Sequence, residues 1–389
     1  MTYWTLDQAQ ITADLQAMVR INSVNPGLAA DGAGEGEIAA WLFNRCRMLG
    51  LEVELQETAP GRPNVIARWR GTGRGRSLLL TGHTDVVDTA HMPDDPFSAR
   101  VEAGRLYGRG ALDMKGGLAA FLGAAAALKA SGFQPAGDLW LGFVTDEEFA
   151  SIGADALVKR VKADAAILSE PTDCQICIAH KGFAWLTVTT EGVAAHGSRH
   201  DVGVDAIAHM GRILAEVERL NREHFPQNQH PLLGRASAHA SLIGGGLGLS
   251  TYPDACTLQI EHRLLPDETP EEVMALWQSA LDRLASDDPQ FRARAALDLT
   301  RPGYEIAPEA PIALALHDAC LRAGQTSPEY TGMSAWLDSA VFAAAGIPTI
   351  IYGPGGDGMH GPVEYVLLDD VFHCAAVFAD TAAEWCGGA

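Results

Sequence analysis

Long apolar runs are missing from this sequence, and their absence excludes a membrane-spanning protein. No segment reaches the roughly 18 consecutive apolar residues that a membrane-spanning helix needs. The stretch 1–20 carries Asp7 and Asp14 and has no unbroken apolar run of the kind found in secretory signals. We therefore expect a soluble, cytoplasmic protein that has no membrane partner.

Basic residues and paired cysteines are also scarce. Asp and Glu outnumber Lys and Arg by 49 to 28, and the formal charge of −21 argues against nucleic acid as a partner. The seven cysteines are an odd number scattered along the chain, so reduced thiols are a simpler interpretation than a disulfide framework. Cys174 and Cys177 form a lone C-x-x-C. Without a second pair, two small strand or turn residues are a better interpretation than a redox motif or half a zinc site.

The chain has enough apolar residues for more than one packed core. It is 389 residues long and 47% hydrophobic, and single cores stop growing near ~250–300 residues, so we expect two domains. Helical and strand patterns alternate in the first part, which predicts an α/β fold with helices covering a mixed, mainly parallel sheet. The predicted helices are Leu6–Arg20, Gly36–Leu49 and Lys115–Ala130, and the predicted buried strands are Leu78–Thr81, Leu139–Val144, Ala165–Leu168 and Thr349–Tyr352.

The pattern changes near His180. Predicted strands at 185–190, 237–243, 256–264 and near 293–299 enclose predicted helices at 204–224 and 270–285. This β-α-β-β-α-β order is typical of a ferredoxin-like α+β domain. We expect such a domain at 180–296, inserted into a first domain that is made of 1–179 and 297–389.

Acidic residues and histidines follow directly after the four buried strands. They are His83 and Asp85, then Asp146, Glu147 and Glu148, then Glu170, and finally His360 beyond a glycine-rich loop. Ligands bind outside the carboxyl ends of the strands in open α/β sheets, so we expect these segments to meet in one crevice. Asp113 lies in a glycine-rich bend before a helix, where small residues let the backbone come close to a metal.

The residue types in this set favour metal-dependent hydrolysis. Imidazole together with carboxylate suits Zn²⁺, Co²⁺ or Mn²⁺, whereas an all-oxygen set would have indicated Mg²⁺ or Ca²⁺. One carboxylate is left over, and a hydrolytic zinc site needs such a group as the general base that takes a proton from the attacking water.

The same segments resemble a known family. They are Gly82–Val87 (GHTDVV), Gly110–Lys115 (GALDMK), Thr145–Glu148 (TDEE), Ser169–Pro171 (SEP), Ala195–Gly197 (AHG) and Gly358–His360 (GMH). Together they resemble the di-zinc metallopeptidases and deacylases that include acetylornithine deacetylase, succinyl-diaminopimelate desuccinylase, aminoacylase and glutamate carboxypeptidase. The resemblance covers nearly the whole chain, including the inserted domain.

The resemblance implies two Zn²⁺ per subunit, for which Co²⁺ or Mn²⁺ can substitute. His83 and Glu148 match the ligands of one ion, Glu170 and His360 match those of the other, and Asp113 matches the carboxylate that bridges both. Glu147 matches the general base. Asp85 matches the carboxylate that orients the imidazole of His83.

The resemblance also implies roles for the inserted domain, as a lid and as the interface of a homodimer. His196 matches a histidine that helps stabilise the oxyanion, usually across the dimer interface. Arg263 matches an arginine that holds the carboxylate of the substrate. Gly355 and Gly356 are expected to offer backbone donors for the same end of the substrate. Ser250 stands where family members often have an asparagine that contacts the substrate.

The segment Met333–Asp338 (MSAWLD) also departs from the better-known members, because bulky Trp336 and Leu337 precede the acidic position. We expect a distinct, apolar specificity pocket on that side. The favoured function is hydrolysis of the linear amide bond of an N-acyl amino acid. The alternatives are a dipeptidase, a glutamate-type carboxypeptidase and a metal-binding protein without catalysis.

Two other enzyme classes are excluded because the sequence lacks their motifs. Gly332–Trp336 (GMSAW) lacks the closing glycine of a serine-hydrolase nucleophile elbow. The glycine clusters at 32–34 and 71–75 do not lie in the strand-to-helix fingerprint of a dinucleotide-binding protein.

Overall fold

The computed structural model describes residues 4–387 and divides into two compact units. Unit 1 comprises Met1–Ile178, Ile306–Thr331 and Leu337–Ala389, and unit 2 comprises Ala179–Glu305 and Gly332–Trp336. The expected insertion at 180–296 therefore ends too early. Its last strand runs on to Arg301, and a short return segment of the chain also belongs to unit 2.

Unit 1 is built on a mixed sheet whose centre is parallel. Its strands follow the order β1-β2-β6-β3-β7-β15-β8, with β6, β3, β7 and β15 parallel to one another. The strands are β1 (Glu52–Ala59), β2 (Arg62–Trp69), β3 (Leu78–His83), β6 (Leu139–Val144), β7 (Ala165–Leu168), β8 (Ile176–His180) and β15 (Thr349–Ile351). The predicted α/β class with a mixed, mainly parallel sheet is confirmed.

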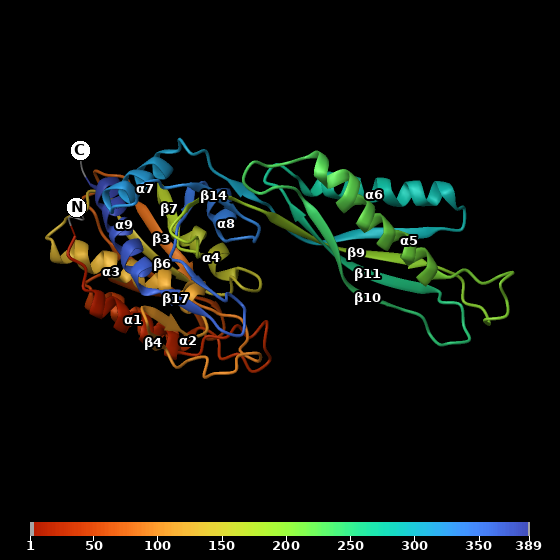
Figure 1. Ribbon diagram of the computed structural model, residues 1–389, viewed down its shortest axis with the longest axis horizontal. Coiled ribbons are helices and arrows are strands. Elements are labelled where there is room, and N and C mark those ends of the chain that lie inside the picture. Colours follow the sequence, from red (N-terminus) through yellow and green to blue (C-terminus); the bar gives the residue numbers. More distant parts are fainter. Residues whose placement is uncertain (1–3, 388–389) are drawn as a thin grey trace. The chain divides into compact units, whose positions relative to one another are not determined.

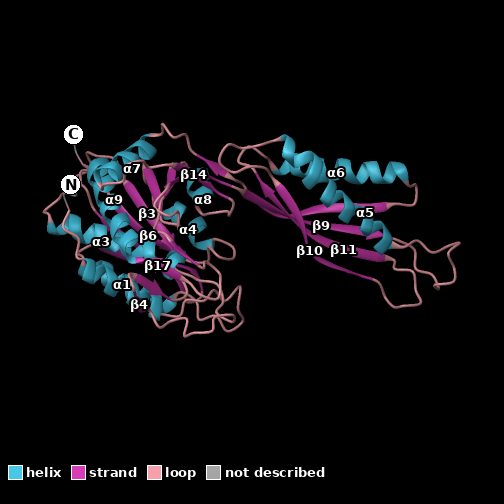
Figure 2. Ribbon diagram, viewed as in Figure 1, coloured by secondary structure: helices cyan, strands magenta, loops and turns pink. Residues whose placement is uncertain are grey.

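Helices cover both faces of this sheet (Figures 1 and 2). Thr81 pairs with Gly142, so Gly82 points to the opposite face from Gly142. Gly82 faces Leu118 of α3, because a Cβ atom added at this glycine would contact that side chain. Gly142 faces Leu157 of α4 in the same sense. Helices α3 and α4 therefore lie on opposite faces of the sheet. The helices are α1 (Gln8–Arg20), α2 (Gly36–Met48), α3 (Gly116–Ala130), α4 (Ile152–Arg160), α7 (Pro311–Arg322), α8 (Ser339–Ala344) and α9 (Leu368–Cys386).

Helix α3 forms the centre of the unit 1 core. It is rich in Ala and Leu because it packs on several sides, and Phe121 contacts Phe378 of α9 with ring centroids 4.7 Å apart. The stretch Ala111–Ala130 is long and apolar enough to cross a membrane by length and composition, but it is almost wholly buried in the protein. The burial of α3 on all sides therefore identifies it as a helix of the protein core.

Unit 2 has the predicted β-α-β-β-α-β order. Its sheet follows the order β10-β11-β9-β12, and its strands are β9 (Gly182–Glu191), β10 (Ser237–Gly245), β11 (Ala255–Leu264) and β12 (Arg292–Arg301). Helix α5 (Ala206–Arg219), which continues as a wider turn to His224, and helix α6 (Pro270–Asp287) pack on one face. Alternate residues of β11 are buried against the helices, and Thr269 and Glu272 form a capping box at the start of α6.

Short strands complete the fold. The sheet β16-β17-β5-β4 consists of β4 (Arg100–Glu102), β5 (Arg105–Tyr107), β16 (Gly356–Asp357) and β17 (Tyr365–Leu367). It ties the segment before Asp113 to the segment on both sides of His360, which are far apart in the sequence. Strands β13 (Tyr304–Glu305) and β14 (Tyr330–Met333) lie where the chain passes between the units.

Candidate active site

The carboxyl ends of three parallel strands carry the first candidate residues. Strand β3 ends at His83, β6 leads into Glu147 and Glu148, and β7 leads into Glu170. Because β3 lies between β6 and β7 and runs parallel to both, these side chains emerge at the same edge of the sheet. The convergence that the sequence predicted is present.

Asp113 lies between two histidines. Its Oδ1 is 3.1 Å from Nε2 of His83, and its Oδ2 is 3.1 Å from Nε2 of His360. Each carboxylate oxygen therefore faces a different imidazole nitrogen, which is the arrangement of a carboxylate that bridges two metal ions. Asp113 is 6% exposed, so water cannot replace these contacts freely.

The remaining two ligand candidates divide differently from the expected grouping. Glu170 lies on the His83 side, with 3.8 Å between its Oε1 and Nε2 of His83. Glu148 lies on the His360 side, 3.2 Å from Nε2 of that residue. One group is thus His83, Asp113 and Glu170, and the other is Asp113, Glu148 and His360. Within each group, the ligand atoms lie within 4.8 Å of one another. The expected pairing of His83 with Glu148 and of Glu170 with His360 is not the one the structure forms.

The chemistry of these groups fits two divalent cations. Oε1 of Glu170 is buried and has no hydrogen-bond partner among the described residues, which costs free energy unless a cation compensates it. Burial raises the pKa of Glu170 well above its usual range, with the Asp113 and Glu148 carboxylates acting in the same direction. Burial also opposes ionisation of Asp113, but hydrogen bonds from His360 and His83 hold its pKa below the usual range.

Glu147, the expected general base, lies in the same cluster. Burial raises its pKa well above the usual range, and the nearby Glu170 carboxylate adds to this effect while His83 opposes it. The buried carboxylate of Asp338 acts in the same direction as Glu170. A carboxylate whose proton affinity is raised in this way is suited to take a proton from water and to return it.

Asp85 contacts this cluster in an unexpected way. Its carboxylate accepts hydrogen bonds from the backbone N–H groups of Glu147 and Glu148, both at 3.2 Å, and from Nδ2 of Asn25 at 2.7 Å. The imidazole of His83 instead lies with Nδ1 2.9 Å from the backbone carbonyl oxygen of Asp85 and 3.7 Å from its carboxylate. The backbone of Asp85 therefore orients His83, and its side chain fixes the segment that carries Glu147.

A buried polar network behind this segment was missed by sequence reasoning. Arg62 of β2 donates to Glu35 at 2.6 Å and to Asp146 at 2.8 Å, and Asn25 donates to Asp146 at 3.0 Å. Asp146 has a φ of 70°, a left-handed conformation that is unfavourable outside glycine and needs such support. The network holds the turn immediately before Glu147. Its members come from separate segments, and no local motif joins them.

Glu364 is a second positioning residue that the sequence did not indicate. Its buried carboxylate accepts hydrogen bonds from the backbone N–H groups of Gly110, Leu112 and Asp113 at 2.9–3.1 Å, and from Nη1 of Arg109 at 2.7 Å. Arg109 also donates to the backbone carbonyl of Gly361, beside His360. One ion pair therefore connects the loop that carries Asp113 to the loop that carries His360.

Unit 2 contains the three remaining side-chain candidates, at two ends of its sheet. Arg263 pairs with Phe183 near the start of β9, whereas His196 follows the end of that strand and pairs with Thr251. The eight residue-to-residue steps from Phe183 to Glu191 span roughly 26 Å at ~3.3 Å per step. His196 and Ser250 therefore lie together, with Gly197 N–H donating to the Ser250 carbonyl, and Arg263 lies far from both.

The local contacts of these residues differ. His196 is exposed, and its Nδ1 lies 2.9 Å from the hydroxyl of Ser198. Arg263 is half-buried, donates to Glu261 at 2.6 Å and lies over the Phe183 ring. The Trp336 ring packs at a right angle against Phe183 within the same unit.

The glycine loop offers fewer donors than expected. The N–H of Gly355 donates to Oδ2 of Asp370 at 3.1 Å, so it is already engaged. Gly356 lies in β16, opposite Val366 of β17.

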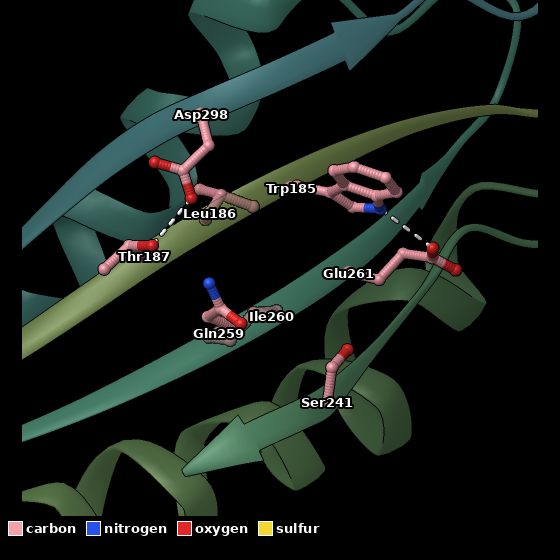
Figure 3. Close-up of a pocket in the computed structure, with 8 residues that line it drawn as sticks. All are labelled: Trp185, Leu186, Thr187, Ser241, Gln259, Ile260, Glu261 and Asp298. Carbon is pink, nitrogen blue, oxygen red and sulfur yellow. Dashed lines mark hydrogen bonds between the residues drawn. The ribbon is translucent and has the colours of Figure 1, made fainter. Parts of the chain in front are cut away.

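A groove of about 530 Å³ lies on the open face of the unit 2 sheet (Figure 3). Trp185 and Glu261 form one side through a hydrogen bond of 3.1 Å, and Asp298 bonds Thr187 on the other. None of the predicted catalytic, metal-binding or substrate-binding residues lines this groove.

The fold and the paired ligand groups define the class of protein, which is a metal-dependent hydrolase of amide bonds. Residues 79–384 match the family "Peptidase family M20/M25/M40", and the chain belongs to this family. The resemblance expected from the sequence motifs is confirmed, as is the expectation of an enzyme that acts on amide bonds.

Comparison with known proteins adds two relatives and two solved structures. The chain is 31% identical to acetylornithine deacetylase of Myxococcus xanthus, over 86% of this chain and 87% of that protein. It is 28% identical to N-formyl-4-amino-5-aminomethyl-2-methylpyrimidine deformylase of Bacillus subtilis, over 90% and 89%. Aminopeptidase PepT of Bacillus cereus shares the fold with a TM-score of 0.81 at 21% identity, covering 97% and 99%. The YXEP protein of Bacillus subtilis, titled a dinuclear metal-binding peptidase, has a TM-score of 0.76 at 16% identity, covering 98% and 100%.

Proposed function

We propose that this enzyme removes the acyl group from an N-acyl amino acid, and that the two candidate ligand groups would hold two Zn²⁺. The observation that carries the proposal is the position of Asp113, whose two oxygens each face a different histidine, with Glu147 in the same cluster. His83, Glu170, Glu148 and His360 complete the proposed ligand set. When bound, the metals polarise the amide oxygen and lower the pKa of a water molecule.

The residues of the chain then have distinct tasks. Glu147 accepts the proton of the attacking water and later delivers it to the nitrogen of the leaving amine, so one carboxylate serves as base and then as acid. The carboxylate of Asp85 and the Arg62 network hold the backbone of Glu147 in place. Arg263 exchanges Glu261 for the carboxylate of the substrate and binds it through two parallel hydrogen bonds. Ser250, Gly356 and the Trp336 side chain are proposed to shape specificity.

The two relatives described above support acyl removal over peptide hydrolysis. Both remove a small acyl group, acetyl or formyl, from an amine according to their names. The peptidases among the solved structures are at most 21% identical and support the fold alone.

We further propose a cytoplasmic homodimer that forms through unit 2, which acts as a lid and as an interface. Strand β10 is at the edge of its sheet and exposes Leu242 and Ile243, and the bend after it exposes Leu247 and Leu249. An exposed apolar edge strand is a template for pairing with a second copy. None of the seven cysteines forms a disulfide in the structure.

The test is initial-rate hydrolysis by metal-free protein that has been reconstituted with Zn²⁺ or Co²⁺. The substrates are matched N-formyl, N-acetyl and N-succinyl amino acids together with dipeptides that have the same carboxyl-terminal residue. We expect metal-dependent turnover of one acyl series at least tenfold above the dipeptides. Faster turnover of the dipeptides would replace the deacylase by a dipeptidase, and binding of one ion per subunit would contradict the two-metal site.

A further inference from the structure

Two cysteines from distant parts of unit 1 lie against each other. Sγ of Cys174 is 3.8 Å from Sγ of Cys374, although 200 positions separate them in the sequence. Cys174 follows strand β7 by six residues, and Cys374 lies in the second turn of α9. The two cysteines form no disulfide in the structure, and neither belongs to the proposed metal site.

The two thiols differ in their surroundings. Cys374 is fully buried, and burial together with the adjacent Cys174 thiol raises its pKa well above the usual value. Cys174 is partly exposed. Its backbone is held at both ends, because its N–H donates to Gly353 O at 2.9 Å and its carbonyl accepts from Gln325 Nε2 at 2.9 Å. The arrangement is a partly exposed cysteine in contact with a buried one.

We propose that Cys174 and Cys374 are a peroxide-reactive pair, in which Cys174 is oxidised first and Cys374 then closes a disulfide. The Cys174 sulfur attacks one oxygen of hydrogen peroxide and the O–O bond breaks, which leaves a sulfenic acid and one water. The Cys374 sulfur then attacks the Cys174 sulfur, the S–S bond forms, the S–O bond breaks, and a second water leaves. Two thiols lose two electrons and two protons, and the peroxide is reduced to water.

Geometry allows the second step without unfolding. A disulfide needs about 2.05 Å between the sulfurs, so the pair must approach by less than about 2 Å, a distance that side-chain rotation can supply. A nearby second thiol captures a sulfenic acid before further, irreversible oxidation to a sulfinic acid. Cys374 is therefore a resolving residue that protects Cys174.

The other cysteines of the described chain are poor competitors. Cys46 and Cys386 are buried, and burial raises the pKa of each to about 12. Burial also raises the pKa of Cys320 to about 12, and its thiol is engaged by the hydroxyl of Tyr352. Cys177 and Cys256 are buried as well, so Cys174 is the one cysteine of the seven that is partly exposed to peroxide in the solvent.

The experiment treats the full-length native protein with a small excess of hydrogen peroxide, blocks remaining thiols with an alkylating reagent, and maps the peptides by mass spectrometry. In the wild type we expect a peptide that links Cys174 to Cys374, lighter by two hydrogens, which a dithiol reductant reverses. In Cys374→Ser the Cys174 peptide should gain two oxygens instead. Cys320→Ser is the matched control and should form the same linked peptide at the wild-type rate.

The wild-type map needs no variant, and Cys374→Ala replaces Cys374→Ser if the buried hydroxyl prevents folding. A wild-type protein in which Cys174 becomes a sulfinic acid, stays unmodified, or links to Cys320 would overturn the proposal.

Discussion

The two units hold their candidate residues by different means. In unit 1, Asp85 and Glu364 accept hydrogen bonds from the backbone of Glu147, Glu148 and Asp113, and Arg62 donates to the preceding Asp146, so the backbone that carries these carboxylates is held in place. In unit 2, His196 is exposed, and its imidazole lies against the hydroxyl of its neighbour Ser198, while Arg263 donates to its neighbour Glu261. The reactive groups of unit 1 are therefore preorganised, whereas Arg263, which is proposed to bind the substrate, must exchange its partner Glu261 when the substrate binds.

The strongest test of this comparison is Asp113→Asn. Loss of one anionic bridge should weaken both proposed metal sites at once, because each Asp113 oxygen faces a different ligand group. We expect metal content well below one ion per subunit and loss of all measurable turnover. Metal analysis after gel filtration measures this. The control is Asp357→Asn, an exposed residue, which should retain full metal content. Retention of two ions in Asp113→Asn would contradict a bridging role.

Glu147→Gln separates catalysis from metal binding. We expect kcat to fall by roughly 10²–10⁴, the usual contribution of a general base, with unchanged metal content because Glu147 is outside both ligand groups. Steady-state kinetics and metal analysis on the same sample measure this. Glu37→Gln, an exposed residue of α2, is the control. A parallel loss of metal and activity would make Glu147 a ligand.

His196→Asn tests whether the unit 2 residue acts across a dimer. Removal of an oxyanion donor should lower kcat by roughly 10²-fold or more. When this variant is mixed with Glu147→Gln and the subunits are exchanged, heterodimers should hold one intact site, and activity should recover to roughly a quarter of wild type. No recovery despite confirmed exchange would place His196 in the site of its own subunit or outside catalysis.

Glu364→Gln should have a smaller effect. The amide retains one acceptor oxygen but loses the charge that binds Arg109 and three backbone N–H groups. We expect metal affinity to fall by roughly 10–100-fold, as for other residues that support ligands, with kcat at saturating metal within a few-fold of wild type. Metal titration followed by calorimetry measures the loss. The control is Glu309→Gln at an exposed position, which should behave as wild type. An unchanged metal affinity in Glu364→Gln would contradict a positioning role for Glu364.

The smallest expected effect concerns the acid stability of unit 2. His262 is buried against Phe225 and Trp277, and burial lowers its pKa to about 4. The unfolded chain then binds this proton more readily than the folded one, so stability falls as pH drops from about 6.5 towards 4, by about 1.4 kcal/mol per pH unit.

His262→Leu should remove this dependence. Urea unfolding of the variant between pH 7 and pH 5, compared with wild type, measures the change. His239→Leu, at an exposed position of β10, is the matched control and should leave the slope unaltered. An equal slope in wild type and His262→Leu would show that another group controls the acid sensitivity.

Much of the fold could be predicted because its strands are short apolar runs. The ranges predicted for β6 and β7 agree with the structure, and the rule that parallel strands share a carboxyl edge placed His83, Glu147 and Glu170 together. The division of the candidate ligands into two metal-binding groups could not be predicted from the sequence. Strand β3 is flanked by β6 on one side and β7 on the other, so the sequence does not tell whether Glu148 or Glu170 shares an ion with His83.

The supporting residues could not be predicted either. Asn25, Arg62 and Glu364 are single polar residues without a local pattern, and their side-chain partners lie between 27 and 255 positions away. Only the folded chain brings them together. The role of Asp85 was misassigned for a related reason, because spacing places a side chain on one side of an extended segment but does not choose between backbone and side-chain contacts.

The packing of α3 has a consequence for how this protein is made. Its apolar surface is covered by α9, yet more than two hundred residues separate Ala130 from Leu368. At ~5–20 residues per second, the ribosome needs roughly 10–50 s to add the covering helix after α3 has been synthesised. During that time one of the most apolar segments of the nascent chain lacks its final partner. Folding of unit 1 is therefore completed only after synthesis of the last helix, and we expect nascent chains stopped before Leu368 to need a chaperone to remain dispersed.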